Sequence, residues 1–342
     1  MTAGQQFAVT ARASAAPPLA ARVFAQLADG RFHSGETLAG ELGVSRGAVW
    51  KAVRLLRASG MDVYAVPNRG YRMPAAAEPL DAARISAYLS GATRTAVRRL
   101  EVLWSVDSTN SMLLARPNPP FGNSEVLLAE YQTAGRGRRG RTWLAPPGAA
   151  ICLSQSWTFR EVPADLGALG LAIGVCVLRA LRRSGLEASL KWPNDVLLGD
   201  RKLGGILLEL RAESTGPASV VVGIGLNATL SASARERIAA LGLPATDLLS
   251  AGIERSRNRV AAHLIDEVVA GLGRFEREAL RPFVEEWRTA DALRGRQLEV
   301  RTAAGTTRGL ACGIDLHGAL LVETPQGVQR FISGEVTVRP VS

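Results

Sequence analysis

Apolar and polar positions follow a helical period in the first part of the chain. Three short helices are predicted, over Leu19–Leu27, Ser34–Leu42 and Arg46–Ser59. A serine stands at the N-cap position of the second and third helices, and a glycine follows each of the three. The pattern therefore predicts a compact three-helix module near the N-terminus.

The third helix is amphipathic and is followed by a turn-rich hairpin. Its apolar stripe has the spacing i, i+3, i+4, i+7 and consists of Val49, Ala52, Val53 and Leu56. Two short strands, Met61–Val66 and Tyr71–Met73, are expected on either side of a Pro-Asn-Arg-Gly turn. A helix, a short turn, a second helix and a hairpin make up the winged helix-turn-helix plan.

The pattern changes to alternating strands and helices between residues 80 and 290. Long helical segments are predicted over Asp165–Arg183 and Asn258–Leu280. The predicted strands are Leu100–Val106, Val126–Tyr131, Ala150–Trp157, Ser189–Trp192, Leu203–Leu210 and Val220–Asn227. This mixture indicates an α+β domain.

The last fifty residues are predicted to form short strands divided by glycine turns. These strands are Gln297–Arg301, Arg308–Ile314, Ala319–Glu323, Val328–Ile332 and Glu335–Arg339, and they indicate a small β-barrel. The predicted domains are a loose tail (1–16), a winged helix-turn-helix domain (17–73), a linker (74–79), an α+β domain (80–290) and the barrel (291–342).

Charge is unevenly distributed along the chain. The net charge is +10, and residues 1–75 hold nine Arg and Lys against four Asp and Glu. Half of the excess therefore lies in about a fifth of the sequence, which predicts a polyanionic partner for the N-terminal part. A hydrophobic share of 47% with 21% charged residues excludes a disordered chain.

Three cysteines and three histidines are scattered along the sequence, so we predict neither a disulfide framework nor a zinc cluster. The longest strongly apolar stretch, Leu166–Val177, is too short to span a membrane. The first twenty residues lack the apolar core of a secretory signal, and a transit peptide is the weaker alternative. We expect a cytoplasmic protein without membrane contact.

Basic residues line the outer face of the third helix. In a helix-turn-helix the second helix enters the major groove by its N-terminal end, and a wing reaches the backbone beside it. An exposed face that only solvates its charges, or a protein-binding module, is the alternative, but helix phase, hairpin and charge all favour DNA. The predicted DNA-binding residues are Ser45, Arg46, Trp50, Lys51, Arg54 and Arg69.

A loop rich in glycine and arginine follows an apolar strand. It reads Gly135-Arg-Gly-Arg-Arg-Gly-Arg-Thr-Trp143. The glycines let the backbone approach a ligand closely, and the guanidinium groups are planar donors that suit phosphate. A disordered arginine-glycine stretch is the alternative, which the preceding strand disfavours. The loop is predicted to cradle a polyanion.

Four further segments carry candidate ligand groups near the ends of predicted strands. Asp107-Ser-Thr-Asn110 offers hydroxyl groups for a small polar ligand, although alone it is an ordinary turn. Lys191-Trp-Pro-Asn-Asp195 precedes Lys202-Leu-Gly-Gly205, which puts a lysine at the start of a strand. Gly223-Ile-Gly-Leu-Asn227 ends the next strand and leaves room for a ring against its backbone.

Taken in this order, behind a helix-turn-helix and before a small barrel, the five segments resemble the bifunctional biotin protein ligase and biotin operon repressor family from residue 18 to the C-terminus. The resemblance implies an α+β fold with three parts. These are a winged helix-turn-helix, a central biotin ligase domain like that of class II synthetases, and a C-terminal SH3-like β-barrel.

The resemblance implies two reaction steps. Biotin and ATP, with Mg²⁺, form biotinyl-5′-adenylate, and a lysine of a biotin carboxyl carrier domain then accepts the biotin. It also implies that the adenylate is a corepressor, and that the adenylate-bound protein forms a homodimer on operator DNA.

The residues that match the family pattern are assigned as follows. The implied catalytic residues are Lys202, Arg138 and Arg136. The implied biotin-binding residues are Ser108, Thr109, Asn110, Gln132, Gly135, Arg136, Trp143, Lys202, Gly223 and Gly225. The implied nucleotide-binding residues are Arg138, Arg139, Lys191, Asn194, Asp195 and Asn227, with Asp195 a candidate ligand of Mg²⁺.

Several alternatives stay open. For Lys202 the alternative is an ordinary surface lysine of a strand, and for Asp195 the alternative is a residue that only caps a turn. The segment Ala228–Ser250, where the family covers the adenine, has no aromatic residue for stacking. Trp104, Trp157 and Trp287 are interpreted as core aromatics. A ligand-sensing repressor without transfer activity and a lipoate ligase are the alternative functions.

Overall fold

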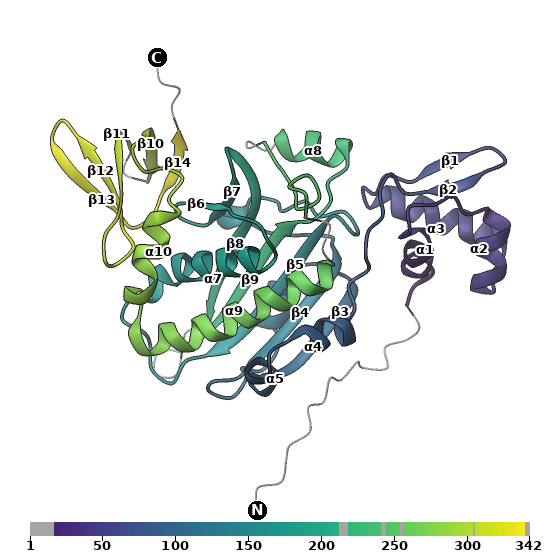
Figure 1. Ribbon diagram of the computed structural model, residues 1–342, viewed down its shortest axis with the longest axis horizontal. Helices are drawn as coiled ribbons and strands as arrows, with labels where there is room; N and C mark the ends of the chain where they lie inside the picture. Colours follow the sequence, from purple (N-terminus) through teal and green to yellow (C-terminus); the bar gives the residue numbers. More distant parts are fainter. Residues whose placement is uncertain (1–16, 212–217, 241–243, 254–255, 304, 339–342) are drawn as a thin grey trace, which may run out of the picture.

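The chain folds into three units, which follow one another along the sequence (Figure 1). The computed structural model describes residues 17–211, 218–240, 244–253, 256–303 and 305–338. The predicted tail, residues 1–16, lies outside these residues, and so does Arg339 at the end of the last predicted strand.

The N-terminal unit has the predicted helix-turn-helix arrangement. It comprises helices α1 (Leu19–Leu27), α2 (Gly35–Leu42) and α3 (Arg46–Ala58) and the antiparallel pair β1 (Tyr64–Val66) and β2 (Gly70–Arg72). The hydroxyl oxygens of Ser34 and Ser45 accept the backbone N–H groups of Thr37 and Ala48, which confirms both predicted caps. The stripe that begins at Val49 is buried, so the opposite, basic face of α3 is exposed.

The central unit contains a seven-stranded sheet in the order β3-β4-β5-β9-β8-β7-β6. Only β3 and β4 are parallel among these pairs; the others are antiparallel. The strands are β3 (Val97–Val106), β4 (Ser124–Gln132), β5 (Ala150–Thr158), β6 (Ser189–Lys191), β7 (Asp195–Leu198), β8 (Arg201–Arg211) and β9 (Ser219–Asn227). All six predicted strands are present. Strand β7 was not predicted, because it consists of only four residues between two turns.

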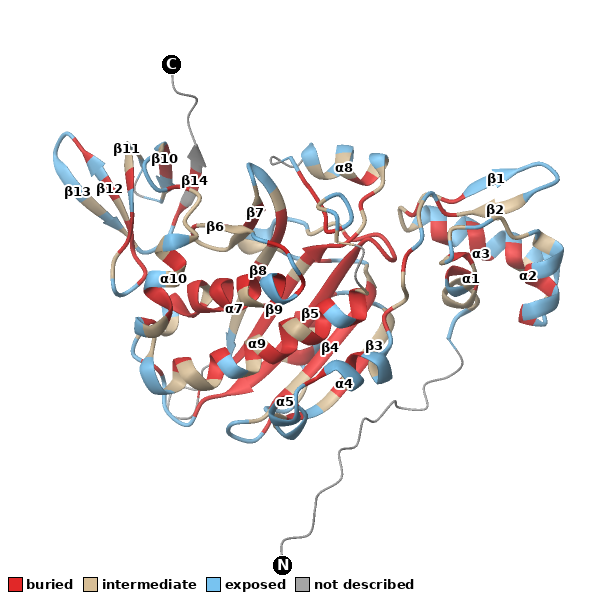
Figure 2. Cartoon of the chain, in the orientation of Figure 1, coloured by how far each residue is buried: buried red, intermediate tan, exposed pale blue. Residues whose placement is uncertain are grey.

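Helices cover one face of this sheet (Figure 2). The two long ones are α7 (Leu169–Arg183), which begins after a 3₁₀ turn (Leu166–Ala168), and α9 (Arg257–Glu278). On β9 the side chains of Val220, Val222, Ile224 and Leu226 belong to the core beneath these helices. Because successive side chains of a strand point to opposite faces, Gly223 and Gly225 lie on the other face.

Shorter helices complete the central unit. They are α4 (Ala82–Tyr88), α5 (Gly91–Ala96), α6 (Thr109–Leu114), α8 (Ala232–Ala239) and α10 (Val284–Thr289), with a 3₁₀ turn at Arg281–Phe283. None of these was predicted, because helices of six to eight residues carry fewer than three turns of apolar periodicity.

The C-terminal unit is a five-stranded antiparallel sheet in the order β13-β12-β11-β10-β14, compatible with an SH3-like fold. Its strands are β10 (Gln297–Thr302), β11 (Gly305–Ile314), β12 (Leu320–Thr324), β13 (Gly327–Phe331) and β14 (Glu335–Val338). They agree with the five predicted strands to within a few residues at each end.

The segment predicted as a linker is packed between the first two units. Ala77 is buried and its N–H donates to the carbonyl of Ala28, while the carboxylate of Glu78 accepts hydrogen bonds from Ser256 and Asn258. Trp104 was interpreted as a core aromatic. It is instead half-buried at the junction, where its ring centroid lies 5.5 Å from that of Phe24 in the N-terminal unit.

Within the part of the chain that the structure describes, no helix combines the length and the apolar character that crossing a membrane requires.

A buried ion pair ties α9 to the sheet. The guanidinium of Arg257 lies 2.9 Å from the carboxylate of Glu130 on β4, and both side chains are only 6% exposed. The same guanidinium donates to the carbonyl of Ala150, and Glu130 also accepts the N–H of Leu80. Both charges are therefore desolvated and paired, although Nε of Arg257 is buried without a hydrogen-bond partner among the described residues.

We expect Arg257→Met to lower the free energy of unfolding by about 3 to 5 kcal/mol, because the carboxylate of Glu130 would remain buried without its partner. Urea denaturation followed by circular dichroism measures the change. Arg274→Met is the matched control, since the Arg274–Glu278 pair is exposed and is expected to contribute less than about 1 kcal/mol. Equal losses in the two variants would contradict the assignment.

Candidate active site

A cavity of about 940 Å³ opens on the face of the sheet that α7 and α9 do not cover. It extends from the first turn of α6 to the start of the C-terminal unit. Its lining includes every predicted biotin-binding and nucleotide-binding residue except Gly135: Ser108, Thr109, Asn110, Gln132, Arg136, Arg138, Arg139, Trp143, Lys191, Asn194, Asp195, Lys202, Gly223, Gly225 and Asn227. Segments about 120 residues apart in the sequence are thus brought into one site.

The two glycines of β9 make room for protein side chains. A Cβ atom on Gly225 would lie 2.6 Å from Cζ2 of Trp143, and one on Gly223 would lie 2.9 Å from Cγ of Asn110. Gly135 lies behind this layer, where its carbonyl accepts the N–H of Trp143 at 2.8 Å. Side chains at these positions would displace both the indole and the amide from the cavity wall.

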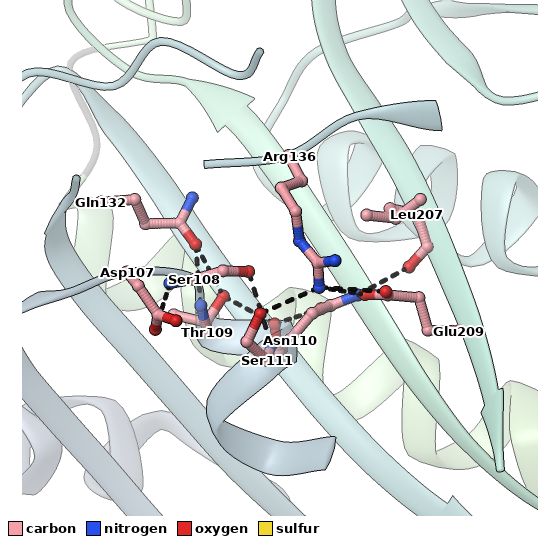
Figure 3. A network of polar contacts seen from close by, with 10 residues as sticks. Asp107, Ser108, Thr109, Asn110, Ser111, Gln132, Arg136, Leu207 and Glu209 are labelled. Atoms are coloured by element: carbon pink, nitrogen blue, oxygen red, sulfur yellow. Dashed lines mark hydrogen bonds and ion pairs between the residues drawn. The ribbon is translucent and has the colours of Figure 1, made fainter. Parts of the chain in front are cut away.

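A polar network forms one end of the cavity, which we call the head end (Figure 3). Ser108 is the N-cap of α6, and the Thr109 N–H donates to Oε1 of Gln132 at 2.8 Å. Oγ of Ser154 on β5 lies 2.6 Å from Oγ1 of Thr109 and 2.5 Å from Oδ1 of Asn110. Nδ2 of Asn110 donates to the carboxylate of Glu209 at 2.8 Å.

The glycine-arginine loop is closed on itself beside this network. The Gly137 N–H donates to the Arg141 carbonyl at 2.7 Å, and Arg138–Gly140 form a 3₁₀ turn. Arg136 is directed toward the head end, where its guanidinium lies 3.0 Å from Glu209 and donates to Oγ of Ser111 at 2.9 Å. The loop therefore lies against the cavity and is linked to β8 by an ion pair.

Positive charge gathers at the opposite, cationic end of the cavity. Nζ of Lys202 lies 2.7 Å from Oδ1 of Asp195, and 5.9 Å from the ring centroid of Trp143. Burial lowers the pKa of Lys191, and the nearby charges of Lys202, Arg141 and Arg296 lower it further, while Asp195 opposes them. An anion would relieve this repulsion.

Two predicted nucleotide-binding residues have their amide N–H groups engaged by the backbone. Nδ2 of Asn194 donates to the carbonyl of Ile206 at 2.9 Å, and Nδ2 of Asn227 donates to that of Thr246 at 3.0 Å. They hold neighbouring segments against β8 and β9. Their side-chain N–H groups are therefore used for positioning.

The segment between Ala228 and Ser250 is anchored by a buried carboxylate. Asp247 accepts hydrogen bonds from the N–H groups of Leu230 and Ser250 and pairs with Arg235. This holds α8 over the cavity, where Ile238 and Pro244 contribute an apolar wall. These two residues supply apolar surface where the sequence offers no aromatic ring.

Three residues in or beside the cavity were not predicted from the sequence. Ser154, Glu209 and Arg296 belong to the network, the ion pair and the cationic end described above. The alternation of β8 was the available signal for Glu209, since Gly205, Leu207 and Glu209 share one face. Arg296 comes from the C-terminal unit, and nothing in the sequence brings it to the cavity.

The predicted DNA-binding residues lie outside the cavity, in the N-terminal unit. Arg46, Lys51 and Arg54 are exposed on α3, and the side chain of Ser45 caps that helix. The Trp50 side chain is 49% exposed, with the Arg54 guanidinium 4.8 Å from its ring centroid. Arg69, in the β1–β2 turn, is exposed and its guanidinium lies 4.0 Å from the ring centroid of Phe32.

Comparisons with known proteins agree with this division of the chain. Residues 21–72 match an HTH domain, residues 102–227 the Biotin/lipoate A/B protein ligase family, and residues 295–339 the Biotin protein ligase C terminal domain. Among solved structures, a biotin protein ligase from Aquifex aeolicus in complex with biotin and ATP has a TM-score of 0.60 at 28% identity. It covers 71% of this chain and 99% of its own.

Curated relatives extend the likeness to almost the whole chain. The biotin–[acetyl-CoA-carboxylase] ligase of Mycobacterium tuberculosis is 36% identical over 253 residues, which cover 72% of this chain and 90% of the relative. The bifunctional ligase/repressor BirA of Escherichia coli is 39% identical over 319 residues, which cover 93% of this chain and 96% of the relative. The chain therefore belongs to the BirA-type family of bifunctional biotin ligases and repressors.

Proposed function

We propose that the protein forms biotinyl-5′-adenylate from biotin and ATP, transfers the biotin to a lysine of a carrier protein, and represses transcription when it carries the adenylate. The observation that carries the enzymatic part is one cavity with a polar head end and a cationic end. Its volume of about 940 Å³ suits a ligand of the size of biotinyl-adenylate.

The first step joins the two ligands at the cationic end. A carboxylate oxygen of biotin attacks the α-phosphorus of ATP, the bond from that phosphorus to the oxygen bridging to the β-phosphorus breaks, and pyrophosphate leaves. Charge builds up on the phosphate oxygens in the transition state. The ammonium of Lys202, held by Asp195, and the guanidinium of Arg138 would stabilise it. The guanidinium of Arg136 pairs with Glu209 at the head end, so we do not assign Arg136 to this step.

The second step uses the mixed anhydride. The amine of the carrier lysine attacks the biotinyl carbonyl and an amide bond forms, the nitrogen loses one proton to solvent, and AMP leaves with the electron pair of the broken C–O bond. The glycine-arginine loop and the indole of Trp143 would shield the adenylate from water until the carrier arrives.

Mg²⁺ would enter bound to the phosphates of ATP and would neutralise part of their charge. Mg²⁺ commonly uses one or two carboxylates beside phosphate oxygens and water. Asp195 and Asp200 are the acidic residues in the described cavity lining, so this donor set suits such an ion. Asp195 is the carboxylate we assign to it.

The repressor activity would reside in the N-terminal unit. We assign α3 to the major groove and the β1–β2 hairpin to the role of a wing. This assignment is supported by the exposed basic face of α3 and by Arg69 in the hairpin turn. Adenylate-dependent homodimerisation would place two such units on the two half-sites of an operator.

A lipoate ligase is the alternative for which the matched family leaves room. The head end disfavours it, because the dithiolane ring of lipoate has no N–H or carbonyl group to satisfy the polar network. Competition of biotin against lipoate in a thermal-shift assay separates the two ligands.

We expect Lys202→Ala to lower kcat for biotinyl-adenylate formation by about 100-fold or more, because a charge that stabilises the transition state is lost. Release of radioactive pyrophosphate measures this rate. Lys51→Ala, which removes a lysine of α3, is the control and should retain the wild-type rate. An unchanged rate in Lys202→Ala would exclude this lysine, and no adenylate with the wild-type protein would exclude the ligase.

The lowered pKa of Lys191 predicts an alkaline limit of ATP use. Since this ammonium loses its proton at a lower pH than an ordinary lysine, kcat/KM for ATP should fall as the pH approaches the usual lysine value of about 10.4. Lys191→Arg should move the fall to higher pH, because guanidinium keeps its charge. Identical pH profiles would contradict the role of Lys191.

The same shift has a defined sign for stability. The folded protein binds fewer protons than the unfolded chain between the two pKa values of Lys191. Its contribution to the free energy of unfolding therefore increases as the pH rises through that window.

Affinity for operator DNA should decrease steeply with salt, because arginines that bind phosphates release counterions. We expect Arg46→Ala and Arg54→Ala each to weaken binding and to reduce the slope of log K against log salt by about one. Fluorescence anisotropy at several salt concentrations measures both quantities. Arg259→Ala, an exposed arginine of α9, should change neither. A salt-independent affinity would rule out DNA as the partner.

A further inference from the structure

We infer that Glu209 is a positioning residue that fixes which groups donate and which accept hydrogen bonds at the head end, and that it thereby selects a cyclic urea. The inference rests on the proposed function, because it concerns how the same cavity recognises biotin. Glu209 lies on β8, and its carboxylate contacts both Asn110 and Arg136 (Figure 3).

The carboxylate orients the amide of Asn110. A carboxylate oxygen only accepts hydrogen bonds, so the group of Asn110 that lies 2.8 Å from it must be the NH₂ group. The carbonyl oxygen Oδ1 then faces Ser154 at 2.5 Å. Because Oδ1 also only accepts, the single proton of the Ser154 hydroxyl is directed to Asn110.

The orientation passes from Ser154 to Thr109. These two hydroxyl oxygens are 2.6 Å apart, and Ser154 has no second proton to donate. Thr109 must therefore donate its own proton to Ser154. Its longer contact with Oε1 of Gln132, at 3.2 Å, is left without that proton.

The cavity consequently presents hydrogen-bond donors and acceptors to the ligand at fixed positions. Thr109 Oγ1 retains only lone pairs, so it accepts a hydrogen bond from a ligand. Oε1 of Gln132 is occupied by the Thr109 N–H, so Gln132 offers its NH₂ group as a donor. A cyclic urea has N–H donors on either side of a carbonyl acceptor. It therefore complements a site in which the Thr109 acceptor lies beside the Gln132 donor.

Arg136 holds the carboxylate of Glu209, at which this series of hydrogen bonds begins. Its guanidinium lies 3.0 Å from Glu209 and donates to Ser111 in the first turn of α6. It balances the negative charge close to the ligand and ties β8 to the helix that carries Thr109 and Asn110. The ion pair thus supports recognition at a distance from the cationic end.

The selectivity has a clear physical origin. A ligand without the urea N–H and carbonyl groups leaves the buried Thr109 and the half-buried Gln132 without a ligand partner. Sites built to hydrogen-bond a polar group can reject analogues that lack it by up to about 10⁴–10⁵-fold. A neutral residue at position 209 would leave the longer contact with the Leu207 carbonyl, at 3.3 Å, as the remaining one of these two acceptors for the Asn110 NH₂ group, and the amide could then turn over. The hydroxyl protons would then reverse direction: Ser154 would donate to Thr109, and the Thr109 proton would point to Oε1 of Gln132 or toward the ligand N–H. In either case Thr109 would no longer offer the ligand both of its lone pairs.

Isothermal titration with biotin and with its two oxazolidinone analogues, in which one or the other ring N–H is replaced by oxygen, tests this reversal. We expect wild-type protein to prefer biotin over the more weakly bound analogue by at least about 30-fold, the cost of leaving the buried Thr109 acceptor without a donor. Glu209→Gln should weaken biotin binding about tenfold or more and reduce this preference to a few-fold.

A compensating double variant makes the test independent of general damage. When Asn110→Asp is combined with Glu209→Gln, the new carboxylate on α6 only accepts hydrogen bonds and the new amide on β8 can donate to it. The proton of Ser154 is then again directed to position 110, and the preference for biotin should return toward the wild-type ratio. Glu125→Gln, which removes a strand carboxylate paired with Arg116 elsewhere on the sheet, is the control and should leave the ratio unchanged.

Three results would overturn the inference: an unchanged preference in Glu209→Gln, an equal loss for all three ligands, or a double variant that does not recover the ratio. Each would mean that Glu209 holds the structure without setting polarity. Failure of the wild-type protein to bind biotin would instead refute the proposed function, so the two failures are distinguishable.

Discussion

The site depends on a short stretch of β9 that carries no side chains on the face toward the cavity. On β9, Gly223 and Gly225 leave the backbone bare where the registers of β5, β8 and β9 meet. That space admits Asn110 from α6 and Trp143 from the glycine-arginine loop, which lie against it from opposite ends. A larger residue at either position would displace the amide that starts the polar network or the indole beside Lys202. Both the head end and the cationic end of the cavity therefore depend on the absence of side chains at Gly223 and Gly225.

Three cations at the cavity are paired with carboxylates before any phosphate arrives. Lys202 is paired with Asp195, Arg136 with Glu209, and Arg296 with Asp200. Each pair holds a long, flexible side chain in a fixed direction, which lowers the conformational entropy lost on binding. Lys191 differs, because burial and three neighbouring cations outweigh Asp195 in lowering its pKa. Its environment becomes favourable only when an anion enters.

The sequence was sufficient for the longer elements and for most of the polar groups that line the cavity. Capping serines, glycine stops and the buried stripe of α3 are local signals, and local signals predicted α1, α2 and α3 at nearly the observed bounds. The ligand groups stand in short motifs of unusual composition, which is why the cavity contains all but Gly135 of them. Their individual chemical roles stay predictions.

What escaped prediction depends on strand register and on domain packing. Glu209 becomes significant only because β8 lies beside β9 and faces the helix that carries Asn110, two segments about a hundred residues apart. Arg296 reaches the cavity because the C-terminal unit packs beside Lys191, and Trp104 lies at a junction because Phe24 meets it there. No residue near these positions in the sequence carries that information.

The junction with the N-terminal unit lies next to the wall of the cavity. Helix α8 contributes Ile238 to the lining, and on the same helix Ser233 donates to the carboxylate of Asp62, just beyond α3, at 3.0 Å. Arg237 lies against Gly60, the glycine that follows α3. A ligand that presses on Ile238 and a DNA duplex that presses on α3 therefore act on opposite sides of one eight-residue helix. A shift of α8 on ligand binding would change its contacts with both the cavity and the N-terminal unit. The ligand and the DNA would then change each other's binding free energy by the same amount, as linkage requires.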